Sequence, residues 1–168
     1  YDGIYVSSML RTQQTAQPLL DLLPPGTEYV VLPGVREIPA GIFEGSSEDA
    51  GLGRLGYAAA PLAWTLGARF VPIPGGEDGN AFDARVDDAL QQIHDNGDEN
   101  AVVFSHGATI MFWTMMNVDN PDLGLLLSHQ LDNTDAVVIE GSPEEGWTLV
   151  SWAGESVDPE PSLPTKLF

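Results

Sequence analysis

The sequence has no cysteine, which excludes disulfide bonds, Cys-ligated zinc, iron–sulfur clusters and cysteine nucleophiles. Basic residues are almost as scarce. Only 6 Lys and Arg stand against 25 Asp and Glu, which gives a formal net charge of −19. Nucleic acids and anionic membranes bind positively charged surfaces, so we expect neither of them as a partner.

Long apolar runs and targeting segments are also lacking. No run reaches the length of a transmembrane helix, and no signal peptide is visible. The absence of cysteine fits both reducing and oxidising compartments. A cytoplasmic location is favoured, although an upstream segment could carry an export signal. The chain opens at Tyr1 inside a strand-like pattern and without a methionine, which predicts a further segment ahead of it.

The residues that are present fit one globular domain. The chain has 168 residues, and 43% of them are hydrophobic, enough for a sizeable core. Gly3–Ser8 and Glu28–Leu32 have the β-branched composition of strands. Between them, apolar residues recur at helical spacing, namely Ala16, Leu19, Leu20 and Leu23. This order predicts a βαβ unit in a mainly parallel sheet.

Positions 33–80 lack clean periodicity and are rich in glycine, so we expect loops with one or two short helices there. Within this region, positions 46–72 are expected to form an insertion on the substrate side of a site. Tyr57, Trp64 and Phe70 could line its entrance.

Regular patterns return after position 80. Phe82–Ile93 and His106–Met116 are expected to be helices. Ala101–Ser105 is apolar on both sides of the pleat, which predicts a central strand. Two more strands flank the turn "SPEEG". We therefore predict an α/β domain over positions 1–153, with a mixed, mainly parallel sheet between two layers of helices, and a Pro-rich irregular tail over 154–168.

Candidate chemistry begins with His106 and Gly107, which stand between a strand and a helix. Ligands of α/β sheets bind at the carboxyl ends of strands, and a helix N-terminus attracts anions. Gly107 would let a ligand approach the backbone closely. The competing interpretation is a core or capping histidine. Arg11 follows the first strand in the matching place, where a guanidinium can clamp phosphate or simply pair with a surface acid.

Two acidic blocks complete the pattern. Glu37 and Glu44 lie in "REIPAGIFEG", and Glu77 lies in "PGGED" just before a helix. In so acidic a chain each of them can equally be a solvated surface group, and Glu77 can be a helix-entry acid that complements the helix dipole.

Together these residues resemble the histidine phosphatase superfamily, also called phosphoglycerate mutase-like. Four blocks match in the family's order: "SSMLRTQQTA", "REIPAGIFEG", "PGGED" and "VVFSHGATI". "LDNTDAVVIE" is similar to the family's entry to its next strand, so the resemblance extends from Tyr1 to about Trp152. It implies the phosphoglycerate mutase-like α/β fold.

The resemblance also implies roles. Arg11, His106 and Gly107 would bind phosphate, Glu37 and His106 would be catalytic, and Ser8 and Glu77 would be supporting groups. A small phosphorylated substrate is implied, with no cofactor and no metal. The oligomeric state stays open.

The resemblance leaves one gap. The family's nucleophilic histidine lies in an Arg-His-Gly block on a preceding strand, and no such block occurs in these residues. We expect a phosphatase that works through a phosphohistidine in the full-length protein, with this chain inactive alone. The alternatives are phosphoglycerate mutase-type phosphoryl transfer and a non-catalytic phosphate-binding or interaction module. A nucleotide cyclase is disfavoured because Gly79 and Asn80 follow "GGED". A serine hydrolase lacks its Gly-x-Ser-x-Gly elbow.

Overall fold

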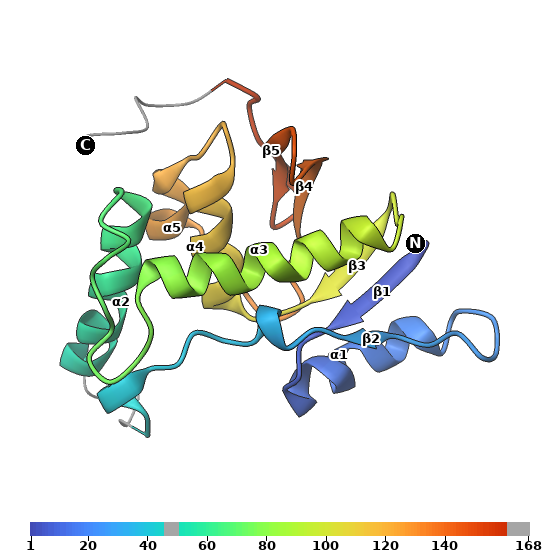
Figure 1. Ribbon diagram of the computed structural model, residues 1–168, viewed down its shortest axis with the longest axis horizontal. Coiled ribbons are helices and arrows are strands. Elements are labelled where there is room, and N and C mark those ends of the chain that lie inside the picture. Colours follow the sequence, from blue (N-terminus) through green and yellow to red (C-terminus); the bar gives the residue numbers. More distant parts are fainter. Residues whose placement is uncertain (46–50, 161–168) are drawn as a thin grey trace.

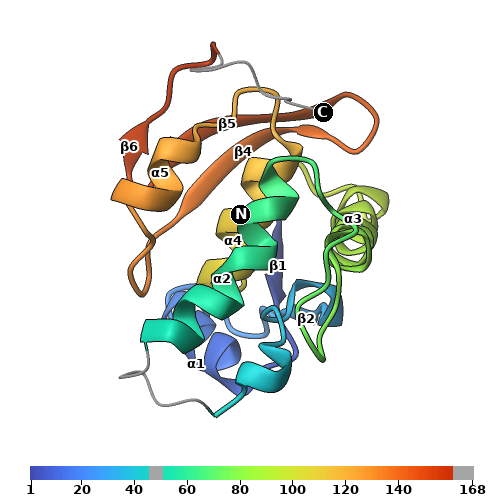
Figure 2. The same cartoon turned by 90° about the vertical axis from the view of Figure 1, so that its left-hand side faces the viewer.

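A computed structural model describes residues 1–45 and 51–160, with the side chains of 51–55 outside the description. Figures 1 and 2 show its strands and helices. The strands are β1 Gly3–Val6, β2 Val30–Val31, β3 Ala101–Phe104, β4 Val137–Ser142, β5 Gly146–Trp152 and β6 Glu155–Ser156. The helices are α1 Leu10–Leu20, α2 Gly51–Thr65, α3 Gly79–Asp95, α4 Gly107–Asn117 and α5 Leu123–Ser128, with short 3-10 turns η1 Pro33–Val35 and η2 Gly41–Phe43. Strands and helices alternate only in the first part of the chain, since α2 is followed by α3, α4 by α5, and the last three elements are strands.

The α/β fold is confirmed, and its strands form two sheets. The first sheet is parallel with the order β2-β1-β3, and its β1–α1–β2 segment is the predicted βαβ unit. The second sheet is antiparallel with the order β4-β5-β6. The tail expected to be irregular from position 154 thus begins with a short strand, and positions 161–168 lie outside the described residues.

The prediction that Ala101–Ser105 is a central strand is wrong for the described residues. β1 is the central strand and is buried along its whole length, whereas β3 pairs with β1 alone and is half-buried at every position. An apolar pattern on both faces of a strand reports what lies above and below the sheet. It does not report how many strands lie beside it.

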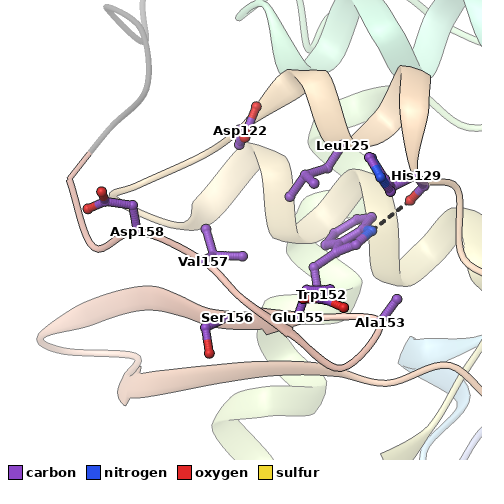
Figure 3. Close-up of a pocket in the computed structure, with 9 residues that line it drawn as sticks. All are labelled: Asp122, Leu125, His129, Trp152, Ala153, Glu155, Ser156, Val157 and Asp158. Atoms are coloured by element: carbon purple, nitrogen blue, oxygen red, sulfur yellow. Dashed lines mark hydrogen bonds between the residues drawn. The ribbon is translucent and has the colours of Figure 1, made fainter.

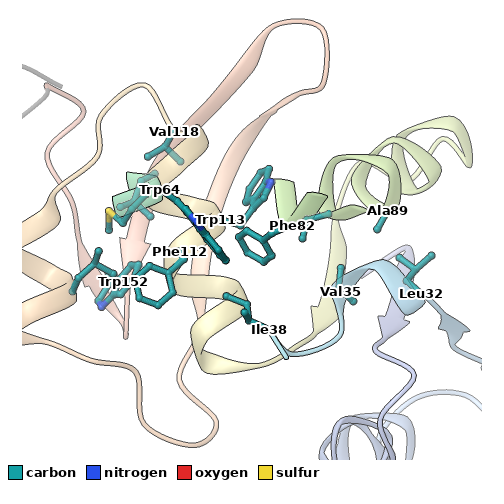
Figure 4. Packing of buried hydrophobic residues seen from close by; sticks show 14 of the residues in the cluster. Leu32, Val35, Ile38, Trp64, Phe82, Ala89, Phe112, Trp113, Val118 and Trp152 are labelled. Atoms are coloured by element: carbon teal, nitrogen blue, oxygen red, sulfur yellow. The ribbon is translucent and has the colours of Figure 1, made fainter. Parts of the chain in front are cut away.

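The core lies between the helices and the sheets (Figure 4). Trp64 of α2 stacks on Phe82 of α3, and Trp113 of α4 meets Trp147 of β5 edge to face. α2 is longer than the short helices expected in this region, and it carries Pro61 inside. Trp64 is 1% exposed, so its expected place at an entrance is wrong. Phe70 is exposed and Tyr57 half-buried, while positions 46–50 of the proposed insertion lie outside the described residues.

No helix in the described part of the chain has the length and apolar character needed to cross a membrane.

Candidate functional site

Arg11 and His106 are in direct contact at the carboxyl edge of the parallel sheet. β1 and β3 are parallel neighbours, so the segments that follow them begin at the same edge. Arg11 enters from the first turn of α1, and His106 is the N-cap residue of α4. The Arg11 Nε–H donates to Nδ1 of His106 at 3.1 Å across 95 positions of sequence. Parallel pairing of two distant strands therefore brings the two predicted residues together.

The other ring nitrogen of His106 meets Ser7, a residue that the motifs did not single out. Ser7 follows β1, is completely buried, and places its Oγ 2.7 Å from Nε2 of His106. Ser8, which was expected to support the site, is exposed, and its side chain makes no hydrogen bond within the described residues. The only sequence signal for Ser7 is its position at the end of a strand. The preference for Ser8 missed the inward-facing serine by one residue.

The carboxylate of Glu37 lies against the first turn of α4. Its Oε1 accepts hydrogen bonds from the backbone N–H of Thr109 at 3.1 Å, the Thr109 hydroxyl at 3.0 Å and the N–H of Ile38 at 2.9 Å. Glu37 is thus tied to the helix that His106 begins. Arg11, Glu37 and His106, which are far apart in sequence, come together at one end of the sheet.

Glu77 is connected to this cluster through Arg85. Arg85 of α3 donates to both carboxylate oxygens of Glu77, from Nη2 to Oε1 at 2.6 Å and from Nε to Oε2 at 3.0 Å. The same guanidinium donates to the backbone carbonyls of Gly34 and Arg36, next to Glu37. Because Arg85 holds both of its oxygens, Glu77 is poorly placed to give a proton to a substrate.

The two acidic blocks pack directly on one another. Gly41 has φ +58°, a conformation that favours glycine, and a Cβ there would collide with the Pro74 carbonyl oxygen. The N–H of Ile42 also donates to that carbonyl at 2.9 Å. The glycine of the "E-x-x-x-G" pattern therefore lets the segment carrying Glu37 close on the "PGGED" turn.

The N-terminus of α4 is open at Gly107. A Cβ at this glycine would meet no heavy atom within 4 Å. The His106 side chain makes no capping hydrogen bond to its own helix, so the capping interpretation of this histidine fails. The N-terminal end of α4 attracts anions through its dipole, and Arg11 adds a full positive charge beside it.

The charges around the site act on its titratable groups. Burial is the main cause that lowers the pKa of His106 below its ordinary value of 6.5. Arg11 and Arg85 lower it further, and Glu37 opposes them. Burial also raises the pKa of Tyr57, with added effects from Glu37, Glu44 and Glu77. At neutral pH the structure therefore favours a neutral His106 and a neutral Tyr57.

The remaining histidines lie at other places. His94 of α3 is 3.3 Å from the carboxylate of Glu144, and His129, just after α5, bonds to the Ser128 hydroxyl at 2.8 Å. Neither residue contacts Arg11 or Glu37. Among the described residues, no group of three or more His, Asp or Glu side chains could hold a metal ion.

A cavity of about 490 Å³ lies elsewhere, between α5 and the end of β5 (Figure 3). Trp152 and Leu125 form its apolar part, and Asp122, Glu155 and Asp158 lie around it. None of the predicted site residues lines this cavity, so its size does not make it the functional site. We assign the candidate site by the convergence of side chains at the sheet edge.

Comparisons with known proteins identify the family and the fold of the chain. The family model of the histidine phosphatase superfamily (branch 1) matches residues 1–154. The PE-PGRS family protein PE_PGRS11 of Mycobacterium tuberculosis H37Rv is 48% identical over 182 aligned residues. The alignment covers 100% of this chain and 30% of that protein, so the chain spans less than a third of its curated relative.

Solved structures share the fold. A mycobacterial glucosyl-3-phosphoglycerate phosphatase is similar with a TM-score of 0.66 and 21% identity, over 92% of this chain and 78% of that one. Its complex with inorganic phosphate gives a TM-score of 0.65 and 21% identity, over 91% and 77% of the two chains. The alpha-ribazole phosphatase from Shigella flexneri gives a TM-score of 0.56 and 16% identity, over 97% and 76%.

Proposed function

The chain belongs to the histidine phosphatase superfamily, and we propose that it carries the substrate-binding half of a site that hydrolyses phosphomonoesters through a phosphohistidine. The contact between Arg11 and His106 beside the open N-terminus of α4 carries this proposal. A guanidinium, an imidazole and a helix N-terminus are all groups that donate hydrogen bonds to phosphate oxygens. They meet on a molecule whose net charge is −19, where such a group of donors needs a specific reason.

The nucleophile in this proposal comes from outside the 168 residues. His94 contacts Glu144 and His129 contacts Ser128, both away from the cluster. His106 is already assigned as a hydrogen-bond donor to the phosphate oxygens. A histidine in an Arg-His-Gly block on a further strand would complete the site. Without it, the chain binds phosphate and does not turn over.

The proposed reaction has two steps. The nucleophilic histidine nitrogen attacks phosphorus, and the bond from phosphorus to the ester oxygen breaks. Arg11 and His106 donate to the non-bridging oxygens, and Glu37 gives its proton to the leaving alcohol oxygen. Water then attacks the phosphohistidine, and the Glu37 carboxylate takes the proton that the water loses. Free phosphate and the original histidine are regenerated.

Phosphatase activity is favoured over mutase activity by the scarcity of cations. A mutase must hold a second phosphate on its intermediate, which calls for further basic groups nearby. Arg69 is held in an ion pair with Asp83 and donates to the Met116 carbonyl at 2.9 Å. Arg85 and Arg36 face Glu77. These arginines are engaged with protein groups, whereas Arg11 contacts the neutral ring of His106.

A non-catalytic phosphate-binding module is the second candidate. It is favoured by one observation, namely that the described residues bring only one histidine to the cluster. The two candidates differ in a simple experiment. An N-terminal extension bearing an Arg-His-Gly strand produces metal-independent turnover of a phosphomonoester if the first proposal is correct. It produces no turnover if the chain is only a binding module.

The role of Glu37 is tested in that extended, active protein with Glu37→Gln. The amide oxygen can still accept from Ile38 and Thr109, so the fold is retained. Substrates with alkyl alcohol leaving groups should lose roughly 10²–10⁴-fold in kcat/KM, the usual contribution of a general acid, while p-nitrophenyl phosphate should lose little. Glu44→Gln, a change in an exposed neighbouring acid, is the matched control and should leave the series unchanged. A uniform loss across all leaving groups in Glu37→Gln would remove Glu37 from the proton-transfer role.

A further inference from the structure

The His106 ring is held at both nitrogens, and the two partners differ in kind. Arg11 is on one side with a permanent N–H donor, and Ser7 is on the other with a hydroxyl that can donate or accept. The residue as a whole is 6% exposed. A buried imidazole with both nitrogens engaged has its protonation state fixed by its neighbours.

The hydrogen atoms can be assigned from these contacts. Arg11 Nε always carries a hydrogen, so Nδ1 of His106 must accept with its lone pair. A neutral ring then carries its hydrogen on Nε2 and donates it to Ser7 Oγ at 2.7 Å. Ser7 Oγ also accepts from the N–H of Met9 at 3.1 Å.

The hydrogen of the Ser7 hydroxyl has its own acceptor. Thr12 Oγ1 lies 3.2 Å from Ser7 Oγ and donates its own hydrogen to the Met9 carbonyl at 2.7 Å. Ser7 can therefore donate to Thr12 while it accepts from His106. This arrangement satisfies every hydroxyl and imidazole hydrogen in the network, and it leaves Ser7 as an acceptor for Nε2–H.

The assignment has a consequence for an oxyanion at the proposed phosphate site. The oxygens of a tetrahedral dianion only accept hydrogen bonds, and so does the neutral Nδ1 that faces Arg11. The ring can contribute a donor on that side only by gaining a hydrogen there. We propose that Ser7 is a positioning residue that holds His106 as the Nε2–H tautomer, so that binding of a tetrahedral oxyanion takes up one proton at Nδ1.

The charges that face the ring fit this linkage, which rests on the proposed function. Arg11 from α1, Arg85 from α3 and burial keep the pKa of His106 low in the free protein, and Glu37 from the segment between η1 and η2 opposes them. A dianion beside the ring adds negative charge and raises that pKa. The proton comes from solvent, and the Arg11 Nε–H turns from Nδ1 to the anion. No covalent bond other than N–H is formed.

The tautomer is measured first, on the free protein, by the ¹⁵N chemical shifts of the His106 ring. We expect a protonated Nε2 and an unprotonated Nδ1 at pH 8. In Ser7→Ala, the ring should become a mixture of tautomers. Ser8→Ala changes an exposed serine next in sequence and should leave the shifts unchanged. A wild-type ring protonated at Nδ1 would overturn the assignment, and this outcome needs no variant to fold.

Proton uptake is measured next, with inorganic sulfate, which stays a dianion over the pH range used. The binding heat should differ between two buffers of different ionisation enthalpy in proportion to a proton uptake that approaches one. Sulfate affinity should fall about tenfold per pH unit above the free-protein pKa of His106, the slope for one linked proton. In Ser7→Ala both the buffer dependence and the slope should shrink, and in Ser8→Ala both should stay.

The outcomes separate this inference from the proposed function. Sulfate binding without proton uptake would contradict the Ser7 role and leave the phosphate site standing. A correct tautomer in a protein that binds neither sulfate nor phosphate would contradict the proposed function, and with it the proton linkage.

Discussion

Gly107 has no packing reason to be glycine. Its φ lies outside the left-handed range, and an added methyl group would meet no atom within 4 Å. Such a methyl group would occupy the space beside the first turn of α4, next to His106. The open space leaves room for a ligand to approach the helix N-terminus, and the phosphate-binding role of Gly107 stays a prediction.

Substitution of Gly107 by alanine should therefore separate binding from stability. We expect Gly107→Ala to unfold with a free energy within about 0.5 kcal/mol of the wild type, because the added methyl group meets no other atom of the protein. Its affinity for inorganic phosphate should fall about tenfold, roughly 1.4 kcal/mol. Thermal unfolding and calorimetric titration measure the two quantities.

Gly79→Ala is the matched contrast. A Cβ at Gly79 would lie 2.6 Å from Cγ of Trp64 and 2.9 Å from Cα of Arg69, so the core must shift. We expect a loss of roughly 1–3 kcal/mol of stability from overpacking. If both variants lost the same stability, packing rather than a ligand would explain Gly107.

At the scale of single residues, the sequence predicts those that carry recognisable chemistry and misses those that only face them. Arg11, Glu37 and His106 were predicted from their blocks, and the structure brings them together. Ser7 and Thr109 were missed. Each acts through a contact across more than 70 positions, and nothing in the local pattern marks such a partner. Ser7 follows β1 and Thr109 lies in the first turn of α4, and their contacts become visible only once the strands are paired.

At the scale of elements, a hydrogen bond between a tryptophan of α4 and an aspartate of α3 joins the two helices. The indole N–H of Trp113 donates to Asp87 at 2.9 Å, and Trp113 is buried. Burial raises the pKa of Asp87, and the nearby Asp83 adds to this effect. The ionised form of Asp87 is therefore disfavoured by folding at neutral pH.

Asp87→Asn should stabilise the protein near pH 7. The amide oxygen can still accept from Trp113, and the cost of the partly desolvated charge disappears, so we expect a gain of about 0.5 kcal/mol. Because the pKa of Asp87 is raised in the folded state, the gain should be present at neutral pH, decrease as the pH falls through that raised pKa, and be absent below the ordinary value of 3.8. Denaturant unfolding at a series of pH values measures it. Asp88→Asn, the same charge change one residue on, lacks the indole contact and serves as control. An equal gain in both variants would mean that general charge repulsion is the cause.

Elements with strong periodicity were predicted, and those that depend on tertiary context were not. α3, α4 and the β4–β5 hairpin lie where the patterns placed them. α2 was expected to be loops and short helices because glycine, alanine and Pro61 weaken a helical pattern, yet Trp64 anchors it in the core. The edge position of β3 and the separation into two sheets were also missed, since the sequence of a strand does not encode its neighbours.

At the scale of the whole molecule, the net charge of −19 opposes compactness. Three ion pairs between arginine and a carboxylate occur among the described residues, two at Glu77 and one at Asp83. Most acidic groups are therefore uncompensated, and their mutual repulsion is screened by salt.

Raising NaCl should accordingly stabilise the chain. Going from about 0.01 M to about 0.1 M shortens the screening length from about 30 Å to about 10 Å, so we expect the Tm to rise by several degrees. Chloride is used because sulfate and phosphate would also bind the proposed site. The same concentration steps with an uncharged osmolyte separate screening from solvent exclusion. A Tm that stays constant or falls with NaCl would show that charge repulsion does not limit stability here.

The central claim is that Arg11 and His106 form a phosphate site, and calorimetric titration of the chain with inorganic phosphate tests it most directly. Arg11→Gln and Arg36→Gln remove the same formal charge, but only Arg11 contacts His106, while Arg36 faces Glu77 at 3.8 Å. We predict that Arg11→Gln weakens phosphate binding at least about tenfold and that Arg36→Gln stays within about twofold of the wild type. Equal weakening in both variants, or wild-type affinity in Arg11→Gln, would contradict the account.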